Sequence, residues 1–527
     1  MTEQARWNRV RAAELVGSLS LAADLATGVP LEQGLHSTLI AMRLAQMLGL
    51  DPNSSSQTFY GCLLFYIGCT ATADLAADLF GDELALTTYA TPFRFGSRGE
   101  MVRGMMRAVA PPGSSPWRRA AKLAWGVPKL GATLPQVVAV NCEVAQLISG
   151  RLGLPGDVGR IFEQMAERWD GTGQPAGIGG DQIALPMRII HVARDAAFQV
   201  MLHGPEESAK VIGERGGRAF DPHLSQFVAK NPEVLTLEPG PSLWEPVMEI
   251  EPEPHLVLEK TALDEALAAM GDFADLVSPY LVGHSAGVAE LAGAAARLAG
   301  LDAEEIQRAA TIHDLGRVTV PTRIWRTPTS LNTDDWEGVR LHSYYTERIL
   351  APSPFLSHLA PVATAHHERL DGSGYHRGVP AAVLSPSARL VAAADMYHAM
   401  IEPRPHRLAL TAEEAVRAIQ EEVKVGRLDA QAVAPVLEAV GRRLPRTDGP
   451  AGLTARELEV VGLLARGHQT KQIARNLNIS PKTADRHIQS AYRKIGVSTR
   501  AGATLFAMQV GLVSWGEFPL SPPRRAP

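Results

Sequence analysis

The stretch ERLDGSGYHRGVPAAVLSPSARL (368–390) matches ERWDGTGQPAGIGGDQIALPMRI (167–189) without a gap, 201 residues earlier in the chain. A second pair lies upstream, where GLHSTLIAMRLAQMLGLD (34–51) parallels VGHSAGVAELAGAAARLAGLD (282–302), with helices expected to start at His36 and His284. Self-similarity of this kind indicates that one folded unit occurs more than once. We therefore expect the first block of the chain to be a diverged copy of the second.

Helical periodicity dominates the sequence. Runs such as 284–301 place apolar residues at helical spacing, whereas the alternation of Val, Ile and Thr that favours strands is scarce. Two Pro-rich stretches are typical of linkers. The sequence therefore predicts a mainly α protein with two helical bundles in tandem and a smaller C-terminal helical domain. The expected divisions are 1–237, the linker 238–255, 256–441, the linker 442–452, 453–515 and a tail at 516–527.

The amino-acid composition limits the classes of protein to which the chain can belong. With 527 residues, the chain is too long for one hydrophobic core, and its 46% hydrophobic and 20% charged residues are ordinary for a globular protein. Cys62, Cys69 and Cys142 form neither a CxxC pair nor a disulfide framework, which suits a reducing compartment. The N-terminus has no signal-peptide core, and no run approaches the roughly 20 apolar residues that span a bilayer. We expect a cytoplasmic protein with no membrane partner.

Charge is distributed unevenly along the chain. Residues 451–527 hold 11 Lys and Arg against 4 Asp and Glu, a net charge of +7, whereas the remaining 450 residues carry −12. A basic segment attached to an acidic body predicts a polyanionic partner for that segment alone.

Histidines and aspartates gather in the second block, in separate helix-like segments. A helical bundle can bring such side chains together at its centre. Imidazole plus carboxylate suits Fe, Mn, Zn or Ni, and a bridging Asp can hold two ions roughly 3.5 to 4 Å apart. Any one of these histidines alone could equally be structural, so the prediction rests on the set. The set comprises His284, His313, Asp314, His342, His366, His367 and Asp395.

In order and context, these seven residues resemble the HD-GYP branch of the HD metal-dependent phosphohydrolases, over about 275 to 425. The resemblance implies that all seven are metal ligands, that His313 and Asp314 form the catalytic pair, and that the substrate is cyclic di-GMP. It also implies divalent transition-metal ions, with Fe or Mn favoured. Tyr280 stands where some relatives place a further Glu ligand, which favours two ions over three.

The second block departs from that family at the residues expected to contact substrate. Arg317 replaces the family lysine and remains able to bind phosphate. The GYP tripeptide is Gly374-Tyr375-His376, which lacks the proline. By position in the motif, Arg404 and Arg407 are expected to contact substrate phosphate, and the alternative is that they are solvated arginines at a helix end.

The first block has lost almost all of these ligands. Only His36 survives, and one imidazole cannot hold a pair of ions, so we expect a packed or capping histidine in a catalytically inactive domain. Sensing, ligand binding and dimerisation all remain open as its role. The replacements are Met165 and Ala166 for the double His, Arg194 for the late Asp, Phe65 and Tyr66 for the HD pair, and Asn141-Cys142 near the position of His342.

Residues 453–512 carry clear helix boundaries. Thr454 with Glu457 forms a capping box, and Gly467 ends the first helix. Ser480, followed by proline, opens the third helix of a predicted helix-turn-helix. The whole segment resembles the LuxR-type DNA-binding domains.

The LuxR resemblance implies that the third helix enters the major groove of double-stranded DNA. Arg486 and Gln489 would then read bases, while Asp485 either accepts a hydrogen bond from cytosine or weakens binding by repelling phosphate. Because one helix-turn-helix contacts only a half-site, we expect a homodimer. The residues expected to contact phosphate are Lys471, Lys482 and Arg493.

The two resemblances together predict a transcription regulator that carries a phosphodiesterase domain. Two alternatives stay open: the second block senses a nucleotide without useful turnover, or it hydrolyses another phosphate ester.

Overall fold

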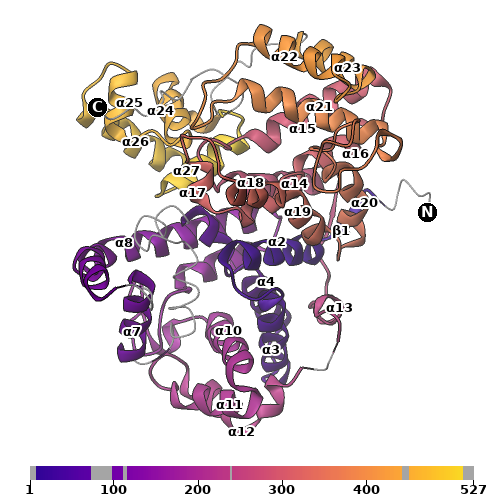
Figure 1. The fold of residues 1–527 in the computed structure, drawn as a ribbon. Helices are drawn as coiled ribbons and strands as arrows, with labels where there is room; N and C mark the ends of the chain where they lie inside the picture. The colour runs from indigo at the N-terminus through magenta and orange to yellow at the C-terminus, as the bar shows by residue number, and fades with distance from the viewer. Residues whose placement is uncertain are drawn as a thin grey trace. The chain divides into compact units, whose positions relative to one another are not determined.

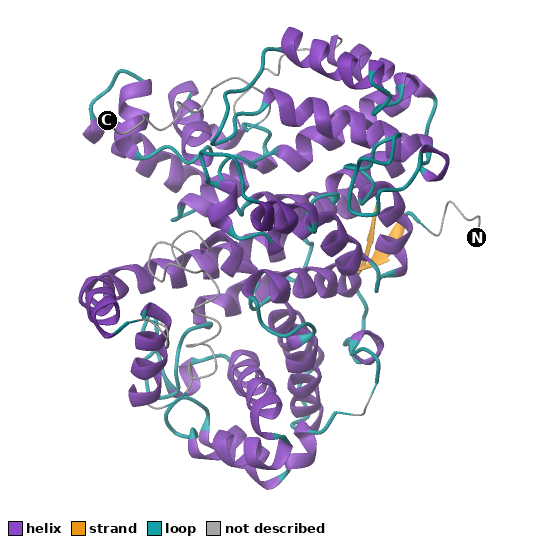
Figure 2. Ribbon diagram, in the orientation of Figure 1, coloured by secondary structure: helices purple, strands orange, loops and turns teal. Residues whose placement is uncertain are grey.

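The computed structural model describes residues 7–72, 96, 98–110, 115–237, 240–441 and 450–513. Nearly all of the regular structure in these ranges is helical (Figure 2). The chain divides into two compact units, Met1–Leu263 and Asp264–Pro527. The predicted tail at 516–527 and most of the predicted linker at 442–452 lie outside the described residues. None of the described helices has the length and hydropathy needed to cross a membrane.

The first unit is a helical bundle with one short two-stranded sheet (Figure 1). Its strands pair antiparallel, with Val10 opposite Leu258. The described elements are β1 (Arg9–Arg11), α2 (Ala12–Thr27), α3 (Gln33–Met47), α4 (Pro52–Leu63), η1 (Ile67–Thr72), α7 (Arg98–Val109), α8 (Pro116–Arg151), α9 (Gly156–Ile161), η3 (Phe162–Gln164), η4 (Gly180–Gln182), α10 (Leu185–His203), α11 (Pro205–Glu214), α12 (Pro222–Lys230), η5 (Pro232–Leu235), α13 (Trp244–Glu249) and β2 (Val257–Glu259).

The second unit begins within α14 and holds a second bundle followed by four shorter helices. The bundle consists of α14 (Lys260–Asp275), α15 (His284–Ala299), α16 (Ala303–Thr311), η6 (Leu315–Thr319), α17 (Thr322–Trp325), α18 (Thr333–Arg340), α19 (His342–Leu350), α20 (Pro354–Ala363), η7 (Ala381–Val383), α21 (Pro386–Ile401), α22 (Ala412–Lys424) and α23 (Ala430–Gly441). After it come η8 (Pro450–Gly452), α24 (Ala455–Ala465), α25 (Thr470–Asn476), α26 (Pro481–Ile495) and α27 (Arg500–Gln509).

The two bundles repeat the same local structure. In each, a long helix (α3 or α15) is followed by a shorter one (α4 or α16), a tight turn and a 3-10 helix (η1 or η6). Asp51 and Asp302 cap the shorter helices in the same way, because each carboxylate accepts hydrogen bonds from backbone N–H groups two and three residues later. The expected start of α15 at His284 is confirmed. The expected start of α3 at His36 is wrong: the left-handed residue before this helix is Glu32, so α3 begins at Gln33.

The loop quoted at the outset is also built twice. Glu167 accepts hydrogen bonds from the backbone of Ala176 and Gly177 at 2.7 and 3.1 Å. In the second copy, Glu368 does the same for Arg377 and Gly378, at 2.9 and 3.2 Å. A buried carboxylate that accepts two loop N–H groups fixes the loop without any metal. The loop can therefore have the same structure in the first block, where the predicted ligands are replaced.

The Pro-rich segment 238–255 contains packed structure. Its helix α13 contacts α2 and α3, and Trp244 at the helix start is 4% exposed. Further along, Glu251 accepts hydrogen bonds from Arg11 Nε at 2.7 Å and from the Tyr60 hydroxyl at 2.6 Å. The segment is therefore attached to the first unit through both apolar and ionic contacts.

The last four helices follow the predicted helix boundaries. Thr454 and Glu457 form the capping box at the start of α24, and the Ser480 side chain accepts the N–H of Thr483 at the start of α26. Gly467, at φ +83°, follows Arg466, the residue that caps the C-terminal end of α24. The core of this domain includes Val460, Leu464, Ile473, Ala484 and Ile488.

The repeated loop generates a stability prediction. A Cβ on Gly374 would lie 2.4 Å from Arg369 N, and a Cβ on Gly173 would lie 2.4 Å from Glu167 Cα. Because backbone atoms cannot move aside cheaply, each Gly→Ala change should lower the free energy of unfolding by about 1 to 3 kcal/mol. Gly150→Ala, in the exposed last turn of α8 with open space around it, is the control and should be neutral or stabilising. Thermal unfolding of the three variants checks this, and equal melting temperatures would contradict it.

Candidate metal centre and DNA-binding surface

All seven predicted ligands come together in the second bundle. His284 is the first residue of α15 and His342 the first of α19, while Asp395 lies in α21. The others occupy two turns, His313 and Asp314 after α16 and His366 and His367 after α20. Every one is at most 2% exposed except His367, which is partly exposed.

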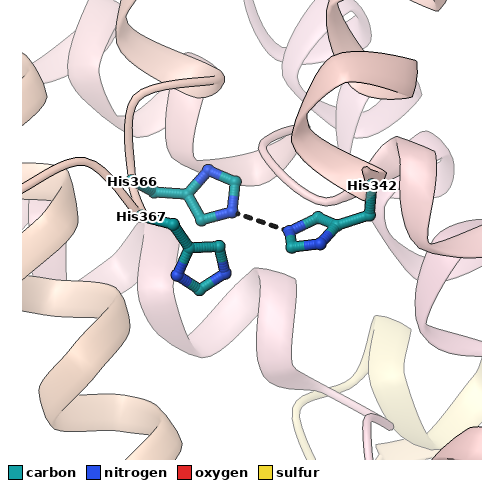
Figure 3. A group of neighbouring side chains, drawn as sticks. All are labelled: His342, His366 and His367. Carbon is teal, nitrogen blue, oxygen red and sulfur yellow. Dashed lines mark hydrogen bonds between the residues drawn. The ribbon is translucent and has the colours of Figure 1, made fainter. Parts of the chain in front are cut away.

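The ligand atoms form two groups that share one carboxylate. The first group consists of His342, His366 and His367 (Figure 3), and the second of His284, His313, Asp314 and Asp395. Oδ1 of Asp314 lies 3.2 Å from His342 Nε2 and 3.4 Å from His366 Nε2, facing the first group. Its Oδ2 lies 2.8 Å from His313 Nε2 and 3.4 Å from His284 Nε2, in the second. Asp314 thus has the geometry of a bridge between two ions.

The protonation of the imidazoles favours a cation between them. His342 and His366 each direct Nδ1 to a backbone carbonyl three residues earlier, at 2.5 and 2.6 Å. A ring nitrogen that donates there leaves a lone pair on Nε2. The two Nε2 atoms nevertheless lie 3.1 Å apart (Figure 3). Two lone pairs at that distance repel each other unless a proton or a metal ion lies between them.

The buried polar atoms at the centre also favour a bound cation. Nε2 of His313 and both oxygens of Asp314 are fully buried and make no hydrogen bond to any part of the chain that the structure describes, although they approach one another to 2.8 Å. Groups of this kind are costly to bury unless something binds them. Since imidazole nitrogen and carboxylate oxygen are ordinary ligands of divalent transition metals, the residues fit such ions.

The electrostatics of the seven predicted metal ligands favour the binding of cations. Burial raises the pKa of Asp314, but Arg317 and His313 outweigh it and hold that pKa well below its usual value. Burial lowers the pKa of His366 to about 4, so its imidazole is neutral and free to ligate. At His313 burial also lowers the pKa, but the Asp314 carboxylate dominates and raises it to about 9. A proton and a metal ion therefore compete for His313 Nε2.

The three arginines predicted to contact substrate are occupied within the protein. Arg317 is 5% exposed, and its Nη1 lies 2.7 Å from Asp314 Oδ2. Arg404 donates to Glu402 Oε2 at 2.8 Å and to the carbonyl of Tyr280. Arg407 donates to the carbonyls at the C-terminal end of α21 and so caps that helix. Their role as phosphate contacts stays a prediction, and the structure adds a local role for each.

The sequence-based prediction missed two residues beside the centre. His398 and Glu402 form a third group of possible ligand atoms together with His284. Burial raises the pKa of Glu402, but the neighbouring cationic groups, His284 first, hold it well below its usual value. A signal was present in the sequence: Asp395, His398 and Glu402 are spaced by three and four residues, which places them on one helix face.

In the first bundle, a protein cation lies at the predicted equivalent of Asp395. The guanidinium carbon of Arg194 lies 3.4 Å from the centroid of the Phe65 ring and 4.0 Å from that of Tyr66. These three residues stand at the predicted equivalents of Asp395 and the HD pair. His36 is 8% exposed, and burial lowers its pKa to about 4. Within the described residues of this unit, no group of His, Cys, Asp or Glu has the spacing of a metal site.

The residues predicted to contact DNA lie on the exposed side of the C-terminal helices. Lys471 is exposed on α25, and the α26 residues Lys482, Asp485, Arg486, Gln489 and Arg493 are exposed as well. The opposite face of α26 buries Ala484, Ile488 and Ala491. His487, the residue between the exposed and the buried face, is only partly buried, whereas Ile488 is 5% exposed.

An ion pair inside this domain fixes the exposed helix. Glu457 of α24 accepts from Lys494 Nζ at 2.6 Å and from the Ser490 hydroxyl at 2.7 Å, both on α26. Hydrogen bonds from Lys494 first, and from Thr454, hold the pKa of Glu457 at about 2. The capping glutamate therefore also sets the position of the predicted recognition helix.

Comparison with known proteins agrees with this geometry. A family model described as an HD domain matches residues 136–224 and 268–432, and one described as bacterial regulatory proteins of the luxR family matches 451–507. The chain belongs to the HD-GYP-type phosphodiesterases of the HD-domain class and carries a LuxR-type DNA-binding domain.

Individual relatives cover the chain to different extents. The 3′3′-cGAMP-specific phosphodiesterase 3 of Vibrio cholerae is 31% identical over 439 residues, which span 81% of this chain and 94% of the relative. A cyclic di-GMP phosphodiesterase of Thermotoga maritima is 38% identical over 142 residues, 26% of this chain and 39% of the relative. A crystal structure of a cyclic GMP-AMP-specific phosphodiesterase of V. cholerae matches with a TM-score of 0.57 at 24% identity, covering 83% of this chain and 99% of that chain. The mainly α, HD-type fold is confirmed.

The shared carboxylate generates a prediction about metal content. Asp314→Ala removes the oxygens that face both groups, so the purified protein should lose most of its bound transition metal. Asp334→Ala, an exposed aspartate at the start of α18, is the control and should bind metal as the wild type does. Elemental analysis of both proteins checks this. Unchanged metal content in the Asp314 variant would refute the assignment.

Proposed function

We propose that residues 256–441 form a metal-dependent phosphodiesterase that hydrolyses a cyclic dinucleotide, and that residues 453–515 bind double-stranded DNA as part of a transcription regulator. The main support for the phosphodiesterase proposal is the position of Asp314, which directs one oxygen to each of two imidazole groups. Because the two proposed partners are a cyclic dinucleotide and double-stranded DNA, the proposed location of the protein is the cytoplasm.

The proposed centre holds two divalent ions, Fe or Mn, because five imidazoles and two carboxylates form two adjoining ligand groups. Bound ions would supply Lewis acidity toward the phosphate and would lower the pKa of a water molecule. The protein's own part is to orient the ligands and to place cationic groups nearby. Arg317 adjoins Asp314, where its guanidinium can contact a substrate phosphate once the carboxylate is neutralised by ions.

Two cyclic dinucleotides are candidate substrates. The relative that matches this chain over 81% of its length, and thus across both blocks, is named as specific for 3′3′-cGAMP. This breadth favours 3′3′-cGAMP. Cyclic di-GMP is favoured by the higher identity, 38%, of a relative that matches over 142 residues.

We assign no catalysis to the first block, residues 1–237. Arg194 stands at the predicted equivalent of Asp395 and would repel metal ions. The helical fold of its described residues leaves sensing, ligand binding or dimerisation as its role, and a homodimer would supply the two DNA-binding domains that adjacent half-sites require.

Hydrolysis assays with the full chain test the enzymatic half. The Mn- or Fe-loaded protein should open a cyclic dinucleotide to a linear product, faster for 3′3′-cGAMP than for cyclic di-GMP if the match across both blocks reflects specificity. The Asp314→Ala chain should show no turnover, since the first block has no cage of its own. Chelator-sensitive activity in that variant would contradict the inactivity of the first block, and tight nucleotide binding by the wild type without turnover would indicate a sensor.

Paired variants of α26 test the DNA-binding half. Arg486→Ala should reduce discrimination between an operator and random DNA by roughly 1 to 3 kcal/mol, because the side chain is proposed to read a base. Lys482→Ala should weaken binding to both about equally, because it is proposed to contact phosphate. Titrations at several salt concentrations measure both effects. Unchanged affinity after deletion of 450–527 would rule out this surface.

A further inference from the structure

The ligand imidazoles differ in how their Nδ1 atoms are held. Three of them direct Nδ1 to the backbone carbonyl three residues earlier, at 2.5 to 2.6 Å; these are His313, His342 and His366. At His284 the corresponding carbonyl, that of Leu281, accepts the backbone N–H of His284 itself, at 2.9 Å. The Nδ1 of His284 lies instead 2.8 Å from Oε2 of Glu402, a residue 118 positions later in the chain.

Glu402 reaches His284 because of its position on α21. It follows the last residue of that helix and lies seven residues, or about two helical turns, after Asp395. The two carboxylates therefore project from the same side of α21. Oδ1 of Asp395 lies 3.1 Å from Nε2 of His284, so α21 contacts both nitrogens of one ring. Only Nε2 faces Asp314 and the rest of the second ligand group.

Glu402 is itself held on two further sides. His398, one turn earlier on α21, places Nδ1 3.2 Å from Glu402 Oε1, and its ring packs edge-on against His284 with centroids 5.3 Å apart. Arg404 donates to Oε2 at 2.8 Å and also to the carbonyl of Tyr280, four residues before His284. The side chain of Glu402 is 12% exposed. A carboxylate with these partners has little freedom to rotate.

We propose that Glu402 is a positioning residue of the metal centre: it accepts the Nδ1 proton of His284 and thereby fixes the ring with Nε2 toward the ions. Metal-binding histidines generally donate their second ring nitrogen to a carboxylate or carbonyl in this way. Here a backbone carbonyl performs that task for His313, His342 and His366, and the Glu402 side chain performs it for His284. The remaining imidazole, that of His367, has its Nδ1 3.7 Å from Asp395 Oδ2. The inference rests on the proposed metal centre.

The geometry restricts the effect to one of the two ions. His284 belongs to the group with His313, Asp314 and Asp395, whereas the group of His342, His366 and His367 has no contact with Glu402 among the interactions of the described residues. Loss of the carboxylate should therefore lower the affinity for the ion in the His284 group and leave the affinity for the neighbouring ion unchanged.

The test is a Mn²⁺ titration of the metal-free full chain, followed by electron paramagnetic resonance, with wild type and Glu402→Gln compared. Wild type should bind two ions and show the signal of a coupled pair. Glu402→Gln should bind the first ion normally, show an uncoupled signal, and need roughly 10- to 100-fold more Mn²⁺ for the second. Glu402→Asp, which keeps a carboxylate, should restore part of the lost affinity. Glu413→Gln, an exposed glutamate of α22, is the matched control and should behave as wild type.

The other outcomes are decisive as well. Unchanged affinity for both ions in Glu402→Gln, or equal loss at both, would overturn the positioning role. A wild type that binds three ions and a variant that binds two with undiminished affinity would show that Glu402 is itself a ligand. A wild type that binds no Mn²⁺ or other divalent transition metal would instead refute the proposed metal centre, which separates the two failures.

Discussion

The carboxylate of Asp314 is the contact on which the second bundle is organised. Its two oxygens face imidazoles from four different segments of the chain, and its buried charge is balanced by Arg317 at 2.7 Å. Three of the imidazoles, those of His313, His342 and His366, are oriented by hydrogen bonds to a carbonyl three residues earlier, so for these the tertiary fold has only to bring correctly oriented rings around one anion. The low dielectric of the buried site strengthens every such contact and makes any unmatched charge expensive. This cost explains why the imidazoles, the Arg317 guanidinium and the carboxylates lie together in one buried cluster.

Much of this arrangement could be predicted from the sequence. The internal repeat identified two bundles, and the residues of the proposed metal centre could be named because metal binding demands particular side chains at recognisable places. The capping residues Thr454 and Ser480 gave helix starts, since a helix terminus leaves N–H groups that need an acceptor. Chemistry that depends on one residue type in one local pattern is what a sequence reveals well.

The remaining features depend on tertiary contacts. Glu402 was not among the predicted ligands, because its partner His284 is 118 residues away. The start of α3 depended on a left-handed Glu32, which no residue preference would suggest. Arg404 and Arg407 sit where phosphate contacts are expected, yet their donors serve a helix end and a neighbouring loop. The sequence indicates which groups are available, and only packing decides which of several acceptors each one meets.

Arg194 gives the two bundles different dependences on their surroundings. In the first bundle a guanidinium lies against Phe65 and Tyr66, so the positive charge at that place is covalently part of the chain. In the second bundle, the corresponding positive charge would come from the proposed metal ions, which have to be taken up from the cell. Metal starvation would therefore leave the negative charge of the proposed metal centre unbalanced, whereas the charge beside Phe65 and Tyr66 would stay in place and the first bundle would be unaffected.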